Sequence, residues 1–422
     1  MNIGIIGSGG REHSLCYKLS KSSIVSKIYC FPGNAGTENL GINLEVNINN
    51  FDEIHKQVLD YKIEFLIVGP EVPLVKGIVD YFEEKNIKIF GPSKKASQLE
   101  GSKIFMKKLC NKFNIPSAKF KEIENLEDAE VFLKNLNTPI VVKADGLAAG
   151  KGVIVCENKD SALKNINEIL NGKFSSSSKV IIEEFLEGEE ASYFVLTDGY
   201  NIKCIGTAQD HKRIGEGDTG LNTGGMGAYS PSYLISKEME KKIINKIILP
   251  TINGMREIGC TYKGVLYAGL MIKNDEPKLI EYNIRFGDPE CQVLMMRLKN
   301  DLLKLLIETL RGNLDHEKIS WINDPCITIV AASKGYPEDF KKNVQIKNIE
   351  KINQNEYLQI FHAGTIKDKN GKILSVGGRV LNSTAISNSL KSAREIAISA
   401  LDQLDGENIY FRRDIGNKVI SS

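Results

Sequence analysis

The sequence predicts a mixed α/β and α+β protein in three parts, and three observations lead to this prediction. Residues 1 to about 100 alternate short apolar strands with helical patterns, which is typical of a doubly wound parallel sheet. The middle of the chain contains a glycine-rich hairpin between two apolar strands, followed by longer strands. From Cys326 onward, short strands and a hairpin signal predict a small β-rich domain. We place the domains at residues 1–102, 103–315 and 316–422, with a mobile subdomain at 118–192.

Composition excludes several classes of protein. The chain has 422 residues, of which 42% are hydrophobic, and this is enough for two or three domains. Its 55 basic and 53 acidic residues give a net charge of +2, so no bulk charge draws it to nucleic acid or to an anionic membrane. The eight cysteines form no C-x-x-C pair, the five histidines lie far apart, and no apolar run approaches membrane-spanning length. We therefore expect a cytoplasmic globular protein with reduced thiols.

Strands and helices alternate through the first hundred residues. The predicted strands are residues 3–6, 28–31, 65–68 and 87–90, and the predicted helices are residues 11–19, 52–61 and 74–85. Three loops, at residues 7–13, 32–37 and 69–74, follow the first three strands. Ligands of such sheets bind at the carboxyl ends of the strands, so we expect these loops to contact a ligand.

The loop at residues 7–13 opens a helix, so its backbone amides and Arg11 are suited to hold a phosphate. A dinucleotide fingerprint is the rival interpretation. Glu12 stands at the third glycine position, however, and the second strand ends in Pro32-Gly33-Asn34, without an acid for a ribose 2′-OH. A mononucleotide or sugar phosphate fits better than NAD, and a plain tight turn remains the alternative.

The hairpin at residues 141–153 carries the strongest local signal. Its strands are residues 140–144 and 152–156, and its loop contains three glycines and two alanines. Lys143 ends the first strand and Lys151 lies in the loop, so two cations face one spot. The pattern predicts a cover for a polyphosphate, with backbone N–H groups available to an anion. It is not a Walker A loop, because the spacing fails and a strand follows. A glycine-rich hairpin with solvated lysines is the alternative.

Other elements of the middle region follow in order. We predict a helix at 103–113 capped by Ser102, a helix opened by Asn125 and Asp128, a surface linker at 171–178, strands at 180–184, 192–197 and 202–205, a long functional loop at 206–231, a helix at 236–258, strands at 266–272 and 278–283, and a helix capped by residues 285–290. The last part is predicted to contain strands at 326–332, 361–366, 373–376 and 409–411, a hairpin turn at Asn370-Gly371 and a helix at 385–404.

Two acidic patterns point to nucleotide and metal. The segment from Glu183 to Leu186 has free backbone groups and an acid that can read an adenine edge, and Glu190 at the start of the next strand can accept ribose hydroxyls. Glu281 and Asn283 lie on one face of a strand, because side chains alternate with period two. A carboxylate plus an amide oxygen, completed by phosphate oxygens, suits Mg²⁺. The alternatives are a solvated acidic run and an edge strand with two outward polar residues.

These signals occur in one order, and that order resembles the ATP-grasp superfamily. Within that superfamily, the sequences of several motifs resemble those of the glycinamide ribonucleotide synthetase (phosphoribosylamine–glycine ligase) family. The motifs are G-S-G-G-R-E-H at 7–13, G-P-E-V-P-L at 69–74, E-G-S-K at 100–103, K-A-D-G-L-A-A-G-K-G at 143–152, Q-D-H-K-R at 209–213, N-T-G-G-M-G-A-Y-S-P at 222–231, R-F-G-D-P-E at 285–290, F-H-A-G-T at 361–365 and G-G-R-V-L at 377–381. The resemblance runs from residue 4 to Gly416.

The resemblance implies a role for each candidate residue. The residues implied to bind ATP are Lys103, Lys143, the lid residues Gly146, Gly150, Lys151 and Gly152, Glu183 for the adenine amine, the backbone near Leu186, and Glu190 for the ribose. We expect Gly9, Gly10, Arg11 and Glu71 of the N-terminal sheet to hold the phosphoribosyl group, and we expect Gly224 and Gly225 to bind substrate as well. Glu281 and Asn283 are implied to bind Mg²⁺, with Mn²⁺ as an alternative ion. One departure concerns the strand at 266–272, which lacks the carboxylate that this superfamily often has there. A second metal ion would have few protein ligands.

The implied reaction joins glycine to 5-phosphoribosylamine with ATP, in purine synthesis. Glycine's carboxylate would attack the γ-phosphate to give glycyl phosphate, and the amine of phosphoribosylamine would then displace phosphate. Nearby cations would stabilise the transfer, and a closed lid would exclude water. Arg285 would pair with the glycine carboxylate or the phosphoryl group, and Asp288 or Asp210 would hold the glycine ammonium. A structural ion-pair network is the alternative role for these three residues.

Two other functions compete with this one. An ATP-dependent carboxylase could use the same fold, but the motif at 222–231 resembles the glycine ligases. A catalytically inactive nucleotide-binding regulator would need to have lost basic or metal-binding residues, and Lys103, Lys143, Glu281, Asn283 and Arg285 are all present. We expect a monomer in preference to an oligomer.

Overall fold

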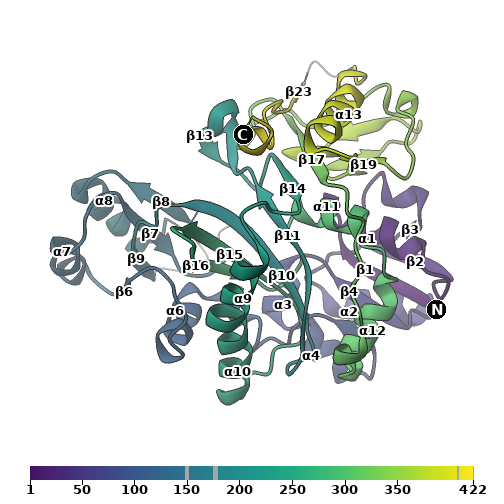
Figure 1. Cartoon of the computed structure of the whole chain (residues 1–422). Coiled ribbons are helices and arrows are strands. Elements are labelled where there is room, and N and C mark those ends of the chain that lie inside the picture. Colours follow the sequence, from purple (N-terminus) through teal and green to yellow (C-terminus); the bar gives the residue numbers. More distant parts are fainter. Residues whose placement is uncertain (148–151, 174–178, 406–407, 422) are drawn as a thin grey trace.

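The computed structural model describes residues 1–147, 152–173, 179–405 and 408–421 (Figure 1). In these ranges the strands form a five-stranded sheet at the N-terminus, a four-stranded sheet in the middle, and a nine-stranded sheet that runs from the middle of the chain into its C-terminal part. We call them the N-terminal sheet, the lid sheet and the long sheet. A small three-stranded sheet, β18-β21-β20, and a two-stranded hairpin, β12-β13, complete the set.

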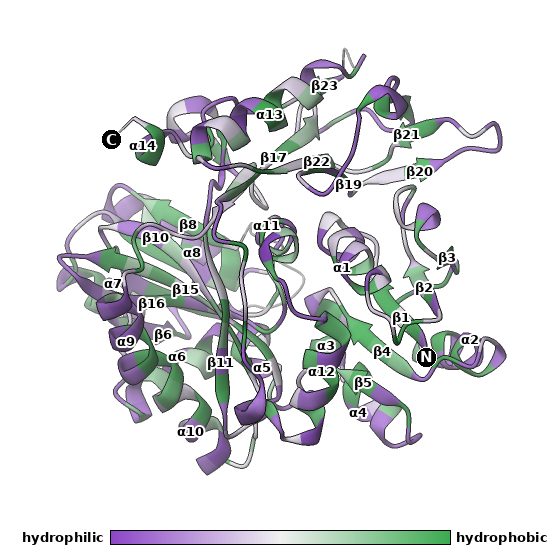
Figure 2. Ribbon diagram, turned by 45° about the vertical axis from the view of Figure 1, so that its right-hand side comes forward, coloured by the Kyte–Doolittle hydropathy of each residue, from purple (hydrophilic) through white to green (hydrophobic). Residues whose placement is uncertain are grey.

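The N-terminal sheet is parallel throughout, with strand order β3-β2-β1-β4-β5, as the alternating pattern predicted. Its strands are β1 (Asn2–Gly7), β2 (Lys27–Pro32), β3 (Ile42–Asn43), β4 (Phe65–Val68) and β5 (Lys88–Phe90), and its helices are α1 (Gly10–Ser20), α2 (Phe51–Asp60), α3 (Glu71–Lys76), α4 (Ile78–Glu83) and α5 (Gln98–Gly101). Neighbouring residues on β4 enter different cores: Leu66 packs with Ile54 of α2, and Ile67 packs with Leu15 of α1. Both faces of the sheet are therefore covered (Figure 2).

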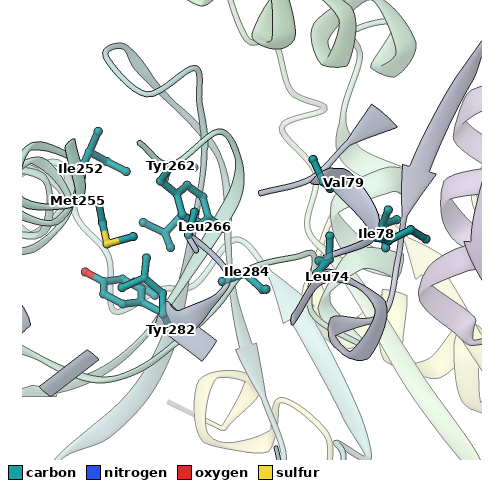
Figure 3. Packing of buried hydrophobic residues seen from close by; sticks show 14 of the residues in the cluster. Leu74, Ile78, Val79, Ile252, Met255, Tyr262, Leu266, Tyr282 and Ile284 are labelled. Carbon is teal, nitrogen blue, oxygen red and sulfur yellow. The ribbon is translucent and has the colours of Figure 1, made fainter. Parts of the chain in front are cut away.

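The single helix predicted at residues 74–85 is wrong. Gly77 adopts φ +95°, a left-handed conformation in which the helix cannot continue, and its N–H closes α3 by donating to Leu74 O. The chain then restarts as α4. The break keeps Leu74, Ile78 and Val79 in one core, which extends to Ile252, Met255 and Ile284 of the central domain (Figure 3).

The lid sheet has the order β6-β9-β7-β8 and carries two helices. The elements of this region are α6 (Lys103–Lys112), β6 (Phe120–Ile123), α7 (Leu126–Lys134), β7 (Ile140–Ala144), β8 (Val153–Cys156), α8 (Lys159–Leu170) and β9 (Val180–Glu184). The predicted caps are confirmed, because Ser102 Oγ accepts from Phe105 N–H and Asn125 Oδ1 accepts from Asp128 N–H. The predicted linker at 171–178 lies partly outside the described residues.

The long sheet has the order β16-β15-β10-β11-β14-β17-β22-β19, with β23 beside β17. Its central-domain elements and their helices are β10 (Glu189–Thr197), β11 (Ile202–Asp210), β12 (Arg213–Gly215), β13 (Thr219–Asn222), β14 (Gly227–Ser230), α9 (Lys237–Ile243), a π-helical turn (Ile244–Ile248), α10 (Leu249–Glu257), β15 (Gly264–Lys273), β16 (Glu276–Asn283), α11 (Glu290–Arg297) and α12 (Leu302–Arg311). The prediction that residues 206–231 form one long loop is wrong, since this segment continues β11 and then forms β12, β13 and β14.

The C-terminal elements are β17 (Cys326–Ser333), β18 (Val344–Gln345), β19 (Leu358–His362), β20 (Thr365–Lys367), β21 (Ile373–Ser375), β22 (Arg379–Ile386), α13 (Leu390–Asp402), β23 (Ile409–Tyr410) and α14 (Asn417–Ile420). The hairpin at Asn370-Gly371 is confirmed by the pairing of β20 with β21. The strand predicted at 361–366 is two strands in different sheets, and the helix predicted at 385–404 begins later, because residues 385 and 386 belong to β22.

Strand β14 joins the central and C-terminal domains, because it pairs with β11 on one side and with β17 on the other. The sheet thus crosses the boundary that we predicted near residue 316, and the exact boundaries stay a prediction. Within the described residues, none of the helices combines the length and the apolar character needed to cross a membrane.

Candidate active site

A cavity of about 1010 Å³ lies where all three domains meet. The lid sheet contributes Val141 and Val155, the long sheet contributes Met271 and Ile280, and the N-terminal and C-terminal domains contribute Glu71 and Arg379. The predicted site residues that line this cavity are Arg11, Glu71, Lys103, Lys143, Gly146, Gly152, Glu183, Leu186, Glu190, Asp210, Gly224, Glu281, Asn283, Arg285 and Asp288. Gly150 and Lys151 lie outside the described residues. In the described chain, Gly9, Gly10 and Gly225 are next to the site without lining it.

At one end of the cavity two lysines share one carboxylate. Glu183 Oε2 lies 3.0 Å from Lys143 Nζ and 3.3 Å from Lys107 Nζ. All three side chains are buried, and Glu183 Oε1 has no hydrogen-bond partner among the described residues. An unsatisfied buried acceptor beside an excess of positive charge is suited to a ligand that brings both a donor and an electron-rich group.

The start of the predicted lid is tied to helix α6. Lys103 Nζ donates to Gly146 O at 2.8 Å, and Asp145 accepts from Ser102 Oγ and from Ile104 N–H. Burial lowers the pKa of Lys103, and Glu281 opposes this effect. Lys103 thus lies at the mouth of the loop and lines the cavity, and its contact with ATP stays a prediction.

Glu281 and Asn283 both line the cavity from β16, as their same-face spacing predicted. Burial raises the pKa of Glu281, but Lys212, Lys143, Lys103 and Arg285 outweigh burial, so the pKa is lowered. The described residues contain no group of three or more His, Cys, Asp or Glu side chains placed to hold a metal ion. A carboxylate and an amide oxygen are oxygen donors that fit Mg²⁺ when phosphate oxygens complete the shell.

Lys212 was not singled out from the sequence, although it lies in the motif at 209–213. Its Nζ is 2.6 Å from Glu190 Oε2. Burial lowers the pKa of Lys212, but Glu190, Glu281 and Asp210 together raise it above its usual value. A lysine among three carboxylates stays charged, so Lys212 adds a cation to the part of the cavity near Glu281.

Arg285 connects the central domain to the N-terminal domain. Its Nε lies 3.2 Å from Glu71 Oε2, and its Nη2 lies 3.0 Å from Glu100 Oε1. Burial raises the pKa of Glu100 to about 7, against the opposing charge of Arg285. Glu71, predicted to contact the phosphoribosyl group, is here a partner of Arg285, and Glu100 is a member of the site that the sequence analysis missed.

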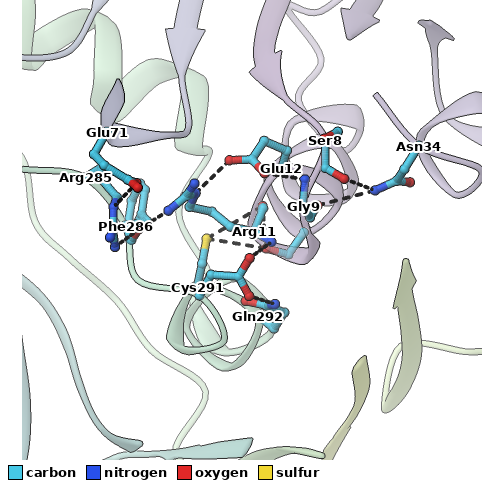
Figure 4. A network of polar contacts seen from close by, with 12 residues as sticks. Ser8, Gly9, Arg11, Glu12, Asn34, Glu71, Arg285, Phe286, Cys291 and Gln292 are labelled. Atoms are coloured by element: carbon cyan, nitrogen blue, oxygen red, sulfur yellow. Dashed lines mark hydrogen bonds and ion pairs between the residues drawn. The ribbon is translucent and has the colours of Figure 1, made fainter. Parts of the chain in front are cut away.

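Arg11 is buried at the cavity wall and is held by contacts within the protein (Figure 4). Its Nε donates to Glu12 Oε1 at 2.7 Å, and its Nη1 donates to Phe286 O at 3.0 Å. Glu12 Oε2 also accepts from Gly9 N–H at 2.6 Å, so the helix start is capped from within. A Cβ on Gly10 would lie about 2.5 Å from the amide nitrogens of Gln292 and Asn382. Gly10 is therefore needed for close packing between domains.

The C-terminal domain enters the site through Arg379. Its Nη1 donates to Gly224 O at 2.6 Å and to Asp288 O at 2.5 Å, and it lies 3.4 Å from Asp288 Oδ1. Tyr336 of the same domain accepts a hydrogen bond from Gly224 N–H at 3.0 Å. Burial raises the pKa of Asp288, but Arg379 and Arg11 outweigh burial and the pKa is lowered. Asp288 is therefore a stable anion.

Asp210 has the opposite environment. Burial and the nearby Glu290 raise its pKa, and its Oδ1 is buried without a hydrogen-bond partner in the described structure. Gly225 has φ +109°, and a Cβ there would lie 2.6 Å from Asp210 Oδ1. The sequence analysis offered Asp288 and Asp210 for the same role, but their environments differ. The lowered pKa of Asp288 favours its charged form, and the raised pKa of Asp210 favours its neutral form.

The side chains that the prediction missed, Lys107, Lys212, Glu100, Glu290, Tyr336 and Arg379, come from several domains. Four of them stand inside motifs that the sequence analysis quoted: Glu100 in 100–103, Lys212 in 209–213, Glu290 in 285–290 and Arg379 in 377–381. The motifs could therefore have indicated these four, whereas Lys107 and Tyr336 carry no such signal.

Family models match nearly the whole chain. The N domain of phosphoribosylglycinamide synthetase matches residues 1–100, its ATP-grasp (A) domain matches residues 101–291, and its C domain matches residues 326–418. A phosphoribosylamine–glycine ligase of Brucella melitensis is 45% identical over 421 residues, which cover 100% of this chain and 98% of that protein. One of Mesorhizobium japonicum is 46% identical over 422 residues, covering 100% and 99%.

Solved structures show the same relationship. The phosphoribosylamine–glycine ligase of Thermotoga maritima matches with a TM-score of 0.85 and 32% identity, over 98% of this chain and 100% of that one. The biotin carboxylase domain of Hydrogenobacter thermophilus 2-oxoglutarate carboxylase, solved with MgADP, ADP and bicarbonate, matches with a TM-score of 0.77 over 100% of this chain and 94% of that one. Its identity is 17%, so it shows a shared fold and does not support carboxylation.

Proposed function

Since the chain belongs to the phosphoribosylglycinamide synthetase family, we propose that the cavity between its domains is the active site of the ligase reaction and assign its residues to individual steps. The protein is a phosphoribosylamine–glycine ligase, which joins glycine to 5-phosphoribosylamine with ATP in purine biosynthesis.

ATP binds between the lid sheet and the long sheet. Lys103 and Lys143 contact its phosphates, and the loop from Gly146 to Gly152 covers them. Glu183 accepts from the adenine amine, the backbone at Leu186 pairs with the ring edge, and Glu190 holds the ribose. The unpartnered Oε1 of Glu183 and the apolar side chains of Val141, Val155 and Met271 that line the same cavity support this assignment.

Glu281 and Asn283 would hold Mg²⁺ together with phosphate oxygens, and Mn²⁺ would be an alternative ion. The ion would neutralise phosphate charge and orient the γ-phosphoryl group. Around it, Lys103, Lys143, Lys212 and Arg285 supply fixed positive charge. The four cations that act on Glu281 support placing the triphosphate here.

The chemistry proceeds through glycyl phosphate. A carboxylate oxygen of glycine forms a bond to the γ-phosphorus while the bond to the ADP oxygen breaks. The amine nitrogen of phosphoribosylamine then forms a bond to the glycyl carbonyl carbon, and inorganic phosphate leaves. Arg285 neutralises the glycine carboxylate or the phosphoryl group in transit. Asp288, a stable anion, holds the glycine ammonium, and Asp210, whose pKa is raised, accepts the proton that the attacking amine loses.

The phosphoribosyl group lies on the N-terminal side of the cavity. Arg11 and Glu71 contact it from the first turns of α1 and α3, and Gly224 contacts it from the turn before β14. Gly9, Gly10 and Gly225 lie next to these residues and allow the close packing of the cavity wall. The bonds from Arg11 to Glu12 and to Phe286 position its guanidinium at the cavity wall. We propose that the enzyme acts as a monomer in the cytoplasm, where its eight cysteines, all free thiols in the described structure, stay reduced.

A single observation carries the proposal: one cavity contains the groups that each step needs. It is lined by Glu183, whose free oxygen can accept from adenine, by Glu281, which has four cations nearby, and by the carboxylates of Asp210 and Asp288. The test is phosphate release from ATP. We expect release when glycine and phosphoribosylamine are added together, and little release with either one alone. Release stimulated by bicarbonate instead would indicate a carboxylase, and nucleotide binding without turnover would indicate a regulator.

A further inference from the structure

Lys107 is a fully buried lysine for which the proposed reaction has no use. It lies on α6, one helical turn after Lys103, and its side chain is 0% exposed. It does not line the cavity, whereas Lys103, Lys143 and Glu183 do. A buried ammonium is costly unless it is paired, so its position requires an explanation.

The contacts of Lys107 join α6 to the lid subdomain. Its Nζ lies 3.3 Å from Glu183 Oε2 on β9 and donates to Ala118 O at 3.1 Å, just before β6. Burial lowers the pKa of Lys107, and Glu183 opposes this effect. Helix α6 lies beside β6 at the edge of the lid sheet (Figure 1). Glu183 therefore contacts one lysine that lines the cavity, Lys143, and one that does not, Lys107.

Both lysines contact the same oxygen of Glu183, and this fixes the carboxylate. Oε2 forms an ion pair with each lysine. Oε1 is therefore a buried acceptor that has no partner in the described residues. If Lys107 were absent, Oε1 and Oε2 would be equivalent for Lys143, and the carboxylate could turn to use both oxygens on it. The unpaired acceptor depends on the second lysine.

We propose that Lys107 is a positioning residue that makes the enzyme select ATP over GTP by keeping Glu183 Oε1 directed at the base. Adenine presents an amino group at its 6-position, which donates to Oε1. Guanine presents a carbonyl oxygen there, which would face another acceptor and leave both groups unsatisfied. This inference rests on the proposed function, in which Glu183 reads adenine, and adds the residue that makes the reading selective.

The test compares the ratio of kcat/KM for ATP to kcat/KM for GTP. In Lys107→Met we expect this ratio to fall at least tenfold and the KM for ATP to rise, while the KM values for glycine and phosphoribosylamine change less than twofold. Lys107→Arg, which restores a cation, should recover part of the ratio. Lys108→Met is the matched control, because Lys108 is the next residue on α6 and its exposed side chain pairs with Glu122 at 2.7 Å. Its ratio should equal that of the wild type.

Two further arms keep the outcomes distinct. Lys107→Gln removes the charge but keeps a donor for Ala118 O, so it replaces the Met variant if that variant does not fold. We expect the same fall in the ratio of kcat/KM for ATP to kcat/KM for GTP. An unchanged ratio in a folded Lys107 variant overturns the inference. Glu183→Gln tests the assignment beneath it. If this variant changes the ratio and the Lys107 variants do not, the adenine assignment stands without a role for Lys107. If neither changes it, the adenine assignment fails as well.

Discussion

Arg379 Nη1 lies 3.4 Å from Asp288 Oδ1, although the two residues are 91 positions apart and belong to different domains. The same nitrogen holds Gly224 O. One side chain of the C-terminal domain therefore fixes two segments that we assign to substrate.

Replacing this arginine should affect the substrate end of the cavity and spare the nucleotide end. A hydrogen bond to a charged group contributes about 1.5–3 kcal/mol, so Arg379→Gln should raise the KM for glycine or phosphoribosylamine roughly tenfold or more. The KM for ATP should stay within twofold. Steady-state kinetics with each substrate varied in turn measures both. Arg413→Gln is the control, since Arg413 is an exposed arginine of the same domain. An equal rise in the KM for ATP would show that Arg379 acts on the whole site.

Glu281 is expected to set the metal requirement. Glu281→Gln keeps the size of the side chain but removes the charge, so the Mg²⁺ concentration for half-maximal activity should rise about tenfold or more. Glu276→Gln provides a control on the same strand, because Glu276 is exposed and pairs with Lys246 at 2.6 Å. Activity is titrated with Mg²⁺ for the three proteins. A titration curve of Glu281→Gln that overlays the wild-type curve would remove this residue from the metal site.

The acid limb of the pH–rate profile should depend on Glu290. Burial and the charge of Glu290 both raise the pKa of Asp210, and we assign the deprotonated form of Asp210 as active. Glu290→Gln removes a like charge, so the pKa of Asp210 should fall and the acid limb of kcat/KM should move to lower pH by about one unit. Asp210→Asn should abolish that limb. If the limb keeps its position in both variants, another group controls it.

Acid should weaken the contact between the N-terminal and C-terminal domains. His13 Nδ1 accepts a hydrogen bond from the backbone N–H of His362 at 2.8 Å. Burial lowers the pKa of both imidazole rings, and it lowers that of His362 to about 4. A folded-state pKa below the unfolded value of about 6.5 means that the unfolded chain binds more protons between these values. Stability is therefore complete above about pH 6.5 and is lost as pH falls toward 4, by up to roughly 3 kcal/mol for His362.

Urea unfolding at several pH values measures this loss. His13→Asn keeps an acceptor near the position of Nδ1 but does not titrate, so its stability should depend less on pH below 6.5 than that of the wild type. His316→Gln is the control, because the His316 side chain is 80% exposed. Parallel pH dependence in the wild type and His13→Asn would assign the acid loss to other groups.

The sequence predicted elements well where apolar periodicity was strong. Strands at 65–68, 140–144 and 180–184 match β4, β7 and β9 to the residue. Strand β22 was missed because its buried residues include Asn382, Ser383 and Thr384, which do not alternate with apolar ones. Thr384 bonds to Thr328 of β17, and Asn382 packs against Gly10 of α1, and no local sequence pattern shows these contacts.

Many residues of the site were predictable from the sequence, but six side chains were missed and the pairings were not predictable. Same-face spacing placed Glu281 and Asn283 correctly in the cavity. Partners of Arg285 and Arg11 come from segments up to 275 residues away, and only the packing of domains decides which acid meets which base. The assigned roles of these residues stay predictions.

The pairing of β14 with β17 has a consequence for any shortened form of the enzyme. A chain that stops near residue 316 would leave β14 as the bare rim of a large sheet, with one row of backbone N–H and C=O groups open to water. Such a rim is a template on which other chains add strands, so the fragment would tend to assemble into aggregates. It would also lose Arg379 and Tyr336 from the cavity wall. The C-terminal domain is therefore part of the structural frame that keeps the ligase soluble, and it could not be removed as a separable module.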